Sequence, residues 1–355
     1  MELPFKVMDA DGHIAEDVSR IRDRMAPPYN DNLWGGVPDR QGRVGHASAL
    51  SDMSFVDTTM GGSMGSVGPP GYPFPNDWLD ALEWGGMDTT ILFPTNLLGY
   101  GNIFDPDYMT ALCRAYNDYV AEEWLKASPR LRAVSLMPLL QVEESIKEMR
   151  RTITELGFSG VTVPAHGFGG LGDRKYDPFY EEAQALDCLV AVHGSTPEYM
   201  RFNKFIQKHT ASFPMSNMLQ LVHMTYEGVF ERFPNLRVGY LETGCTWVPF
   251  FMNRMDEEWE KRGHREATAC KNSPSEYIRS DNVFFHAEPS EDLVPQVVEI
   301  LGENSLFYAS DWPHWDNEYP DNVSQFWNRD DLSFSAKKAI LSDNTRRMYG
   351  MPPEN

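Results

Sequence analysis

The chain has 355 residues, of which 41% are hydrophobic, 12% are aromatic and 23% are charged. This apolar and aromatic content can bury a large core, which excludes a disordered or low-complexity protein. The net charge of −21 disfavours binding to nucleic acid or to an anionic membrane surface, because like charges repel. A small anionic substrate remains compatible with this charge, since a bound cation can reverse the local potential.

The four cysteines are widely spaced and form no CxxC pair. They are Cys113, Cys188, Cys245 and Cys270. This spacing disfavours a zinc ribbon, a redox motif and a disulfide scaffold, and it fits a reducing compartment. The first residues show no basic region followed by an apolar run, and no stretch approaches about 18 uncharged apolar residues. We therefore expect a soluble, cytoplasmic protein without a membrane span.

Eight short apolar runs have the composition of strands that are covered on both faces. In chain order they are residues 7–10, 89–93, 132–137, 160–163, 189–192, 237–241, 283–285 and 306–309. Amphipathic patterns with a helical period lie between most of these runs. They cover residues 108–127, 142–156, 177–186, 216–232 and 290–301. Alternation of strands and helices predicts a parallel sheet, and eight strands is the number that closes a (β/α)8 barrel.

The length alone suggests about two domains, but single barrels often reach this size. No repeat or linker divides the chain, so we predict one domain over residues 1–355. Residues 26–76 form a loop-like insertion after the first strand, rich in glycine and proline. An insertion this long is an active-site lid, a partner-contact arm or a plain surface excursion.

Polar side chains gather where the predicted strands end, which is where barrels of this type build their sites. They include Asp11, His13, Asn96, His166, His193, Glu242, His286, Asp311 and His314. Asp11 and His13 have the i, i+2 spacing that places two side chains on one face of a strand. Because imidazole and carboxylate together are ligands of Zn²⁺ and Mn²⁺, the pattern predicts a divalent metal site at one rim.

Three motifs carry a family resemblance over nearly the whole chain. They are DADGHIAE at 9–16, GVFERFPNLRV at 228–238 followed by ETGCTWVP at 242–249, and SDWPH at 310–314, with Arg254 and Asp256 as an Arg-x-Asp. The chain resembles the amidohydrolase superfamily, in the amidohydrolase-related branch typified by aminocarboxymuconate semialdehyde decarboxylase and γ-resorcylate decarboxylase. The resemblance implies a metal-dependent barrel enzyme that often forms homodimers.

The resemblance also implies the roles of individual residues. The metal ligands would be Asp11, His13, His193 and Asp311, holding one Zn²⁺ or Mn²⁺ per chain. The catalytic residues would be Asp311, Glu242 and His314. Glu242 departs from the family pattern, because the decarboxylases usually have histidine there. A carboxylate could be a general base or an extra ligand, but it cannot clamp a substrate carboxylate.

Further residues near the predicted rim are candidates for substrate binding. They are Asn96, His166, Arg201, Trp247, His286 and Trp312. The two tryptophans form either an apolar wall for an aromatic substrate or part of the core. Arg201 is either a carboxylate clamp or a solvated loop residue.

Two reactions fit such a site. A carboxy-lyase would remove carbon dioxide from a small aromatic or unsaturated acid, with Asp311 protonating the ring carbon. A hydrolase would use a metal-activated water, with Asp311 or Glu242 as base. The branch is rich in decarboxylases, so we favour the lyase, with the hydrolase as alternative and a non-catalytic scaffold as a remote third. The expected partners are an aromatic or anionic acid and a second copy of the chain, which would contact residues 55–104.

Overall fold

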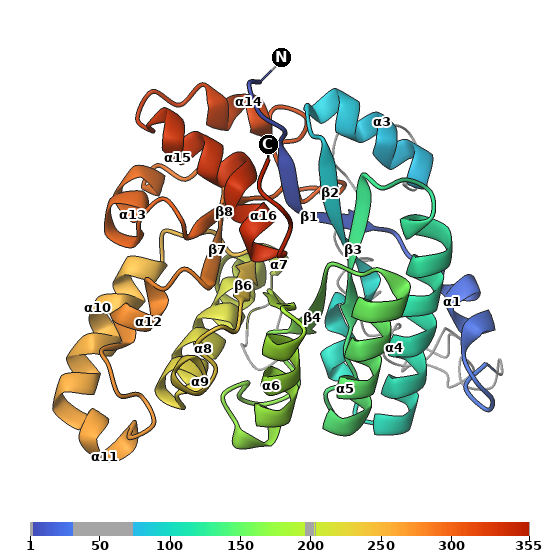
Figure 1. The fold of residues 1–355 in the computed structure, drawn as a ribbon, viewed down its shortest axis with the longest axis horizontal. Coiled ribbons are helices and arrows are strands. Elements are labelled where there is room, and N and C mark those ends of the chain that lie inside the picture. Colours follow the sequence, from blue (N-terminus) through green and yellow to red (C-terminus); the bar gives the residue numbers. More distant parts are fainter. Residues whose placement is uncertain (1–2, 31–73, 196–201, 203, 355) are drawn as a thin grey trace.

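The computed structural model describes residues 3–30, 74–195, 202 and 204–354. Eight parallel strands lie side by side in sequence order. They are β1 (Met8–Ile14), β2 (Thr89–Pro94), β3 (Leu131–Leu136), β4 (Gly160–Pro164), β5 (Leu189–His193), β6 (Val238–Leu241), β7 (Val283–Ala287) and β8 (Leu306–Tyr308). Helices surround these strands on the outside, as Figure 1 shows. The predicted (β/α)8 barrel is therefore confirmed.

The strands form where the sequence has apolar runs, because both faces of each strand are covered. All five residues of β5 and all four of β6 are buried. One face points into the barrel, where Ile91, Phe93 and Leu189 belong to a small inner cluster. The other face packs against the helices in a much larger cluster. β1 runs to Ile14, so Asp11 and His13 lie inside the strand rather than after it.

The seam between β1 and β8 closes the barrel. The backbone N–H of Asp311 donates to the carbonyl of Asp11 (2.9 Å), and that of His13 donates to the carbonyl of Trp312 (2.8 Å). The pairing of β1 with β2 shifts register between Asp9 and Gly12. A β-bulge of this kind bends a strand and redirects its side chains. The bulge therefore lies where β1 carries the residues of the predicted site.

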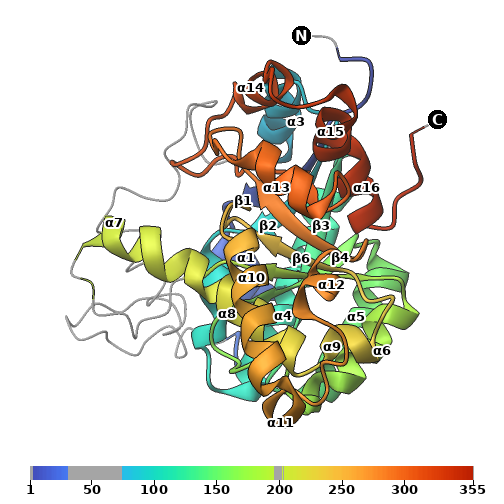
Figure 2. The same ribbon diagram turned by 90° about the vertical axis from the view of Figure 1, so that its left-hand side faces the viewer.

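Most helices fill the connections between consecutive strands. The helices that precede β6 in the chain are α1 (Val18–Arg24), α3 (Pro75–Gly85), α4 (Pro106–Val120), α5 (Val142–Arg151), α6 (Asp177–Ala185), α7 (Phe205–Gln207), α8 (Phe213–Tyr226) and α9 (Val229–Arg232). The helices that follow β6 are α10 (Val248–Glu258), α11 (His264–Glu266), α12 (Pro274–Ile278), α13 (Val294–Leu301), α14 (Asn322–Trp327), α15 (Phe334–Lys338) and α16 (Asn344–Met348). Figure 2 shows the same arrangement from the side. In the part of the chain that the structure describes, no helix has the length and apolarity that a membrane crossing needs.

The structure corrects two predictions, one of a helix and one of a loop-like insertion. The pattern at 216–232 predicted one helix, but the structure has α8 and α9, separated by Gly228 at φ 72°. A Cβ at this position would lie 2.4 Å from the carbonyl oxygen of Ala269, so the break depends on glycine. The predicted insertion at 26–76 overlaps α3 at its end, while residues 31–73 lie outside the described residues.

Candidate metal centre

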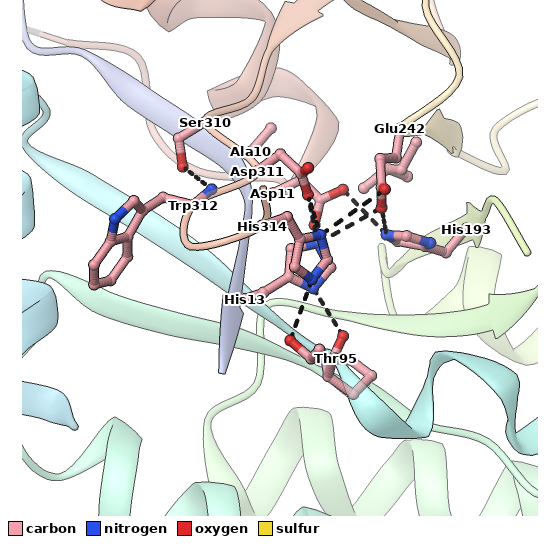
Figure 3. A network of polar contacts seen from close by, with 12 residues as sticks. Ala10, Asp11, His13, Thr95, His193, Glu242, Ser310, Asp311, Trp312 and His314 are labelled. Carbon is pink, nitrogen blue, oxygen red and sulfur yellow. Dashed lines mark hydrogen bonds and ion pairs between the residues drawn. The ribbon is translucent and has the colours of Figure 1, made fainter. Parts of the chain in front are cut away.

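Four strands deliver acidic and imidazole side chains to one point at the carboxyl rim of the barrel. Asp11 and His13 come from β1, and His193 is the last residue of β5. Glu242 follows β6 directly, and Asp311 lies three residues after the end of β8. Figure 3 shows these five side chains pointing toward one another.

The nitrogen and oxygen atoms of this cluster lie within a few ångströms of one another. His13 Nε2 is 3.0 Å from Asp311 Oδ1 and 3.5 Å from Asp11 Oδ1. His193 Nε2 is 3.0 Å from Glu242 Oε2 and 3.3 Å from Asp11 Oδ2. Glu242 Oε2 is also 3.7 Å from His13 Nε2, so the Glu242 carboxylate lies between the two imidazoles.

Backbone carbonyls orient the two imidazoles. His13 Nδ1 lies 2.8 Å from the carbonyl of Pro94, and His193 Nδ1 lies 2.9 Å from the carbonyl of Gly194. A carbonyl can only accept, so each Nδ1 carries a proton and each Nε2 points into the cluster, where a bound metal ion would take its lone pair. A second hydrogen bond of this type is what metal-binding histidines use to fix the ring.

Several atoms of the cluster are buried and, among the described residues, have no partner other than the ionisable groups that converge with them. They are both carboxylate oxygens of Asp11, Nε2 of His13, Nε2 of His193, Oε2 of Glu242 and Oδ1 of Asp311. Buried polar atoms in folded proteins are almost always paired, so a group of unpaired ones converging on one point needs a ligand. Nitrogen lone pairs and carboxylate oxygens together fit a divalent metal ion.

The ligand atoms form two overlapping sets in which all members lie within 4.8 Å of one another. One set is Asp11, His13, His193 and Glu242, and the other is His13, Glu242, Asp311 and His314. Both sets contain His13 and Glu242, so the two residues stand at the centre of the cluster.

The backbone at two of the carboxylates is strained. Glu242 has φ 57° and Asp311 has φ 52°, in the left-handed region that residues other than glycine rarely adopt. Strain of this kind costs about 1–3 kcal/mol per residue and is concentrated at functional sites. The strained backbone at these two strand ends therefore belongs to residues whose carboxylates face the barrel mouth.

Burial and mutual charge shift the ionisation of the cluster. Burial lowers the pKa of His13 to about 3, which keeps its ring neutral. Burial raises the pKa of Asp11 and that of Asp311, where Glu242 adds to the effect. Burial opposes protonation of His193, but the carboxylates of Asp11 and Glu242 outweigh it and raise its pKa. A bound cation would replace the protons that this cluster otherwise retains.

His314 lies beside the cluster and contacts its members. Its ring stacks on that of His13 with centroids 3.8 Å apart, and its Nδ1 is 2.8 Å from Asp311 Oδ1. Its Nε2 is 3.3 Å from the hydroxyl of Thr95. Burial works against the charged ring, but Asp311 raises the pKa of His314 to about 9. His314 and Asp311 are therefore arranged to share a proton.

A cavity of about 250 Å³ opens onto the cluster. Glu242 and Asp311 line it, together with His286 from β7 and residues of the loop after β8. His286, a predicted substrate-binding residue, is thus brought to the site.

The structure places the two tryptophans predicted to bind substrate away from this cavity. Trp312 is 2% exposed and packs edge-on against Trp78 with centroids 4.6 Å apart, and Figure 3 shows its ring pointing away from the cluster. Trp247 packs against Phe285 on the outer face of β7, and its indole N–H donates to the carbonyls of Thr243 and Gly244. Both tryptophans therefore pack against the core and do not form a wall of the substrate cavity.

The remaining candidates lie elsewhere or are not described. His166 follows β4 but lines a separate cavity of about 850 Å³ between the β4 loop, α8 and the end of α10. Arg201 and the side chain of Asn96 lie outside the described part of the chain.

Three residues of the cavity were not found from the sequence. Glu288 follows His286 by two positions, just after β7 ends, so strand alternation continued by one residue could have predicted it. Glu318 lies in an irregular loop, and His209 lies before α8, far from any strand end. No sequence pattern connects these two residues to the site.

An eight-stranded parallel barrel with a buried carboxylate and imidazole cluster at its carboxyl rim defines a (β/α)8-barrel protein with a candidate metal centre. The chain belongs to the amidohydrolase family, whose sequence pattern matches residues 9–351. The predicted resemblance is therefore confirmed.

Known proteins are similar to this chain in sequence or in fold over most of their length. The chain is 26% identical to the 2-amino-3-carboxymuconate-6-semialdehyde decarboxylase of Dictyostelium discoideum over 289 residues, 79% of this chain and 77% of the relative. It is 25% identical to a γ-resorcylate decarboxylase of Rhizobium over 295 residues, 76% of this chain and 85% of the relative. A dihydroxybenzoic acid decarboxylase from Polaromonas, solved with bound manganese and 2-nitroresorcinol, has a TM-score of 0.72 at 18% identity and covers 97% of each chain.

Proposed function

We propose that the protein is a metal-dependent carboxy-lyase that removes carbon dioxide without oxidation from a small aromatic or unsaturated carboxylic acid. The observation that carries this proposal is the group of buried, unpaired nitrogen and oxygen atoms at the barrel mouth. The family membership and the decarboxylases among its relatives support the same reaction.

The proposed metal ligands are Asp11, His13, His193 and Asp311, with one ion per chain. Glu242 Oε2 lies within reach of the same point and would add a further oxygen. A site with this many carboxylate oxygens favours Mn²⁺ over Zn²⁺, because manganese prefers harder ligands. Manganese is also the ion bound in the related Polaromonas structure. The ion, when bound, would polarise the carboxylate of the substrate.

The proton that replaces carbon dioxide would come from Asp311. Its carboxyl group lines the cavity beside the cluster, where it can reach a bound substrate. Transfer of this proton to the ring carbon that bears the carboxylate is followed by cleavage of the carbon–carbon bond. The electron pair of that bond restores the ring, and carbon dioxide leaves. His314, 2.8 Å from Asp311 Oδ1, would then return a proton to Asp311.

The test is release of carbon dioxide from a panel of hydroxybenzoates by the manganese-loaded protein. Asp311→Asn should abolish release while the variant remains folded. Asp330→Asn, which removes an exposed carboxylate of the same type outside the cavity, should leave release unchanged. Failure of the wild-type protein with every carboxylic acid, at full metal occupancy, would contradict the proposal.

One observation favours a second candidate, the hydrolase. Glu242 occupies the position where the decarboxylases usually have histidine, and its Oε2 is buried beside His193. A carboxylate there can accept the proton of an attacking water. The Glu242→His variant separates the two reactions. Histidine can also act as a base, so Glu242→Gln, which cannot accept a proton, is measured beside it. A lyase that takes its proton from Asp311 should keep activity in at least one of the two variants, whereas a hydrolase that uses Glu242 as base should lose it in Glu242→Gln.

We further propose a homodimer in the cytoplasm. Phe104, at the end of the expected contact segment 55–104, is 81% exposed, which is unusual for a large apolar side chain. The four cysteines are buried thiols that form no disulfide, as a reducing compartment requires. Sedimentation of the wild-type chain and of Phe104→Ser should give a dimer and a weakened dimer, respectively.

A further inference from the structure

The cavity beside the metal centre has further polar lining in addition to Glu242 and Asp311. This lining consists of His286 and Glu288 at the end of β7 and Glu318 in the loop after β8, and we call it the Glu288 wall. At about 250 Å³, the cavity is sized for one small ring with short substituents. A small ring held at the metal centre would fill this cavity and would therefore also contact the Glu288 wall.

His286 shows that this wall is built to contact a ligand. Its side chain is 3% exposed, and neither ring nitrogen has a hydrogen-bond partner among the described residues. Burial lowers its pKa, so the ring is a neutral donor and acceptor rather than a cation. Because buried polar atoms are rarely left unpaired, the imidazole is positioned for a group that enters the cavity.

The charge of the cavity indicates which group this is. Five carboxylates line it, of which Glu242 and Asp311 belong to the metal centre and Glu288, Asp316 and Glu318 do not. The only other ionisable side chains among its described lining residues are the imidazoles of His209 and His286, with no lysine or arginine. Asp316 lies 3.5 Å from His209 Nε2, whereas no basic side chain among the described residues forms an ion pair with Glu288 or Glu318.

The carboxylates around Glu288 repel its ionised form. Burial raises the pKa of Glu288 to about 8, and the carboxylates of Glu291, Glu318, Asp311 and Asp316 add to this effect. A carboxylate in such surroundings is stabilised by a nearby positive charge and destabilised by a second anion. The Glu288 wall therefore favours a cationic group and rejects an anionic one.

We propose that the Glu288 wall binds an ammonium group of the substrate, so that the substrate is a small aromatic or unsaturated monocarboxylic acid with an aminoalkyl substituent at its far end. This inference rests on the proposed function, which places the carboxylate at the metal centre. It excludes dicarboxylic acids whose second carboxylate would face Glu288. The wall thus determines specificity, while the metal centre and Asp311 carry the reaction.

The experiment measures binding of unreactive probes to the manganese-loaded full chain by calorimetry. The probes are 3- and 4-(aminomethyl)benzoate, the methylbenzoates of the same shape, and the dicarboxylates isophthalate and terephthalate. We expect at least one aminomethyl compound to bind about tenfold more tightly than its methyl partner, as one charge-assisted hydrogen bond supports. We expect the dicarboxylates to bind more weakly than the methyl compounds.

Two variants assign the preference to the wall. In Glu288→Gln, the tenfold difference between aminomethyl and methyl probes should fall to less than about threefold. Glu299→Gln, the same change at an exposed position on α13 outside the cavity, should keep the full difference. Equal binding of aminomethyl and methyl probes by the wild-type chain, or tighter binding of the dicarboxylates, overturns the inference.

Because these probes are measured by binding alone, the two proposals can fail separately. If the chain releases carbon dioxide from hydroxybenzoates but shows no preference for ammonium probes, the carboxy-lyase function is supported and ammonium binding by the Glu288 wall is contradicted. Conversely, the chain could prefer ammonium probes and yet decarboxylate no acid, including amino-substituted acids. This result would support ammonium binding by the Glu288 wall and would contradict the carboxy-lyase function.

Discussion

The carboxylate of Asp9 accepts two hydrogen bonds from Ser310, one from its backbone N–H (2.7 Å) and one from its hydroxyl (2.8 Å). Asp9 lies on β1 and Ser310 follows β8, so this pair joins the first and last strands at the seam of the barrel. The hydroxyl of Thr90 on β2 donates to the same carboxylate (2.6 Å). Asp11 and Asp311, which lie close to this pair in the chain, face the metal centre, and the pair therefore supports that centre.

Ser310→Ala should destabilise the fold by about 1.5–3 kcal/mol, because it removes a hydrogen bond to a buried charged group. Urea unfolding of the metal-free protein measures the change. Ser342→Ala is the matched control, since its buried hydroxyl donates to the neutral carbonyl of Lys6. It should lose only about 1 kcal/mol. Equal losses in both variants would show that the carboxylate of Asp9 adds nothing to this bond.

Gly12, between Asp11 and His13, allows β1 to pass close to Trp78. A Cβ on Gly12 would lie 2.3 Å from the Trp78 ring and 2.6 Å from the hydroxyl of Thr90. Gly12→Ala should therefore destabilise the protein by about 1–3 kcal/mol through overpacking. The Trp78 indole N–H donates to the carbonyl of His13 (3.0 Å), so a displaced ring should also move His13.

Metal affinity is the readout that separates this effect from simple loss of stability. Gly157→Ala serves as the control, because its φ of 82° makes any side chain strained while its surroundings are open. We expect Gly12→Ala to bind Mn²⁺ at least about tenfold more weakly, and Gly157→Ala to bind it as the wild type does. Normal affinity in Gly12→Ala would mean that β1 adjusts without moving His13.

Strand positions could be predicted from the sequence because each strand is covered on both faces. That requirement gives continuous apolar runs, and it located β5 and β6 within one residue. The carboxyl ends of parallel strands meet at one rim, so Asp11, His193 and Asp311 could be grouped from their places in the sequence alone.

Tertiary contacts decided what the sequence pattern left open. Trp312 lies next to the metal-site residue Asp311, yet its ring packs against Trp78, a residue of the unpredicted helix α3. The break between α8 and α9 depends on the approach of Ala269 to Gly228, which no local pattern records. Glu318 reaches the cavity from an irregular loop, where side-chain direction has no period to follow.

Metal binding should stabilise the folded chain, because the ligands are brought together only in the native state. We expect Mn²⁺ or Zn²⁺ to raise the melting temperature of the wild-type protein by several degrees, and a chelator to reverse the change. His193→Ala should lose this response together with about one equivalent of metal measured by elemental analysis. His264→Ala, at an exposed position on α11, should keep both. A wild-type chain that remains metal-free with either ion would contradict the site.

The ionisation of Glu288 should make stability depend on pH. Its pKa rises from 4.5 to about 8 on folding, so the native state holds the proton more tightly than the unfolded chain. Stability is therefore lost as the pH rises between these two values, and the full loss is present above pH 8. Glu288→Gln removes the ionising group, so it should be more stable than the wild type at about pH 8.5.

We expect this advantage to be of the order of 4 kcal/mol, since one pKa unit corresponds to about 1.4 kcal/mol. It should decline steadily to nearly zero at pH 4.5, where Glu288 carries its proton in the folded state and half of the time in the unfolded chain. Urea unfolding across this range, on metal-free protein, provides the measurement, and Glu299→Gln should show no such trend. An advantage of constant size at every pH would mean that the glutamine side chain simply packs better, and that Glu288 is not held in its protonated form by the surrounding carboxylates.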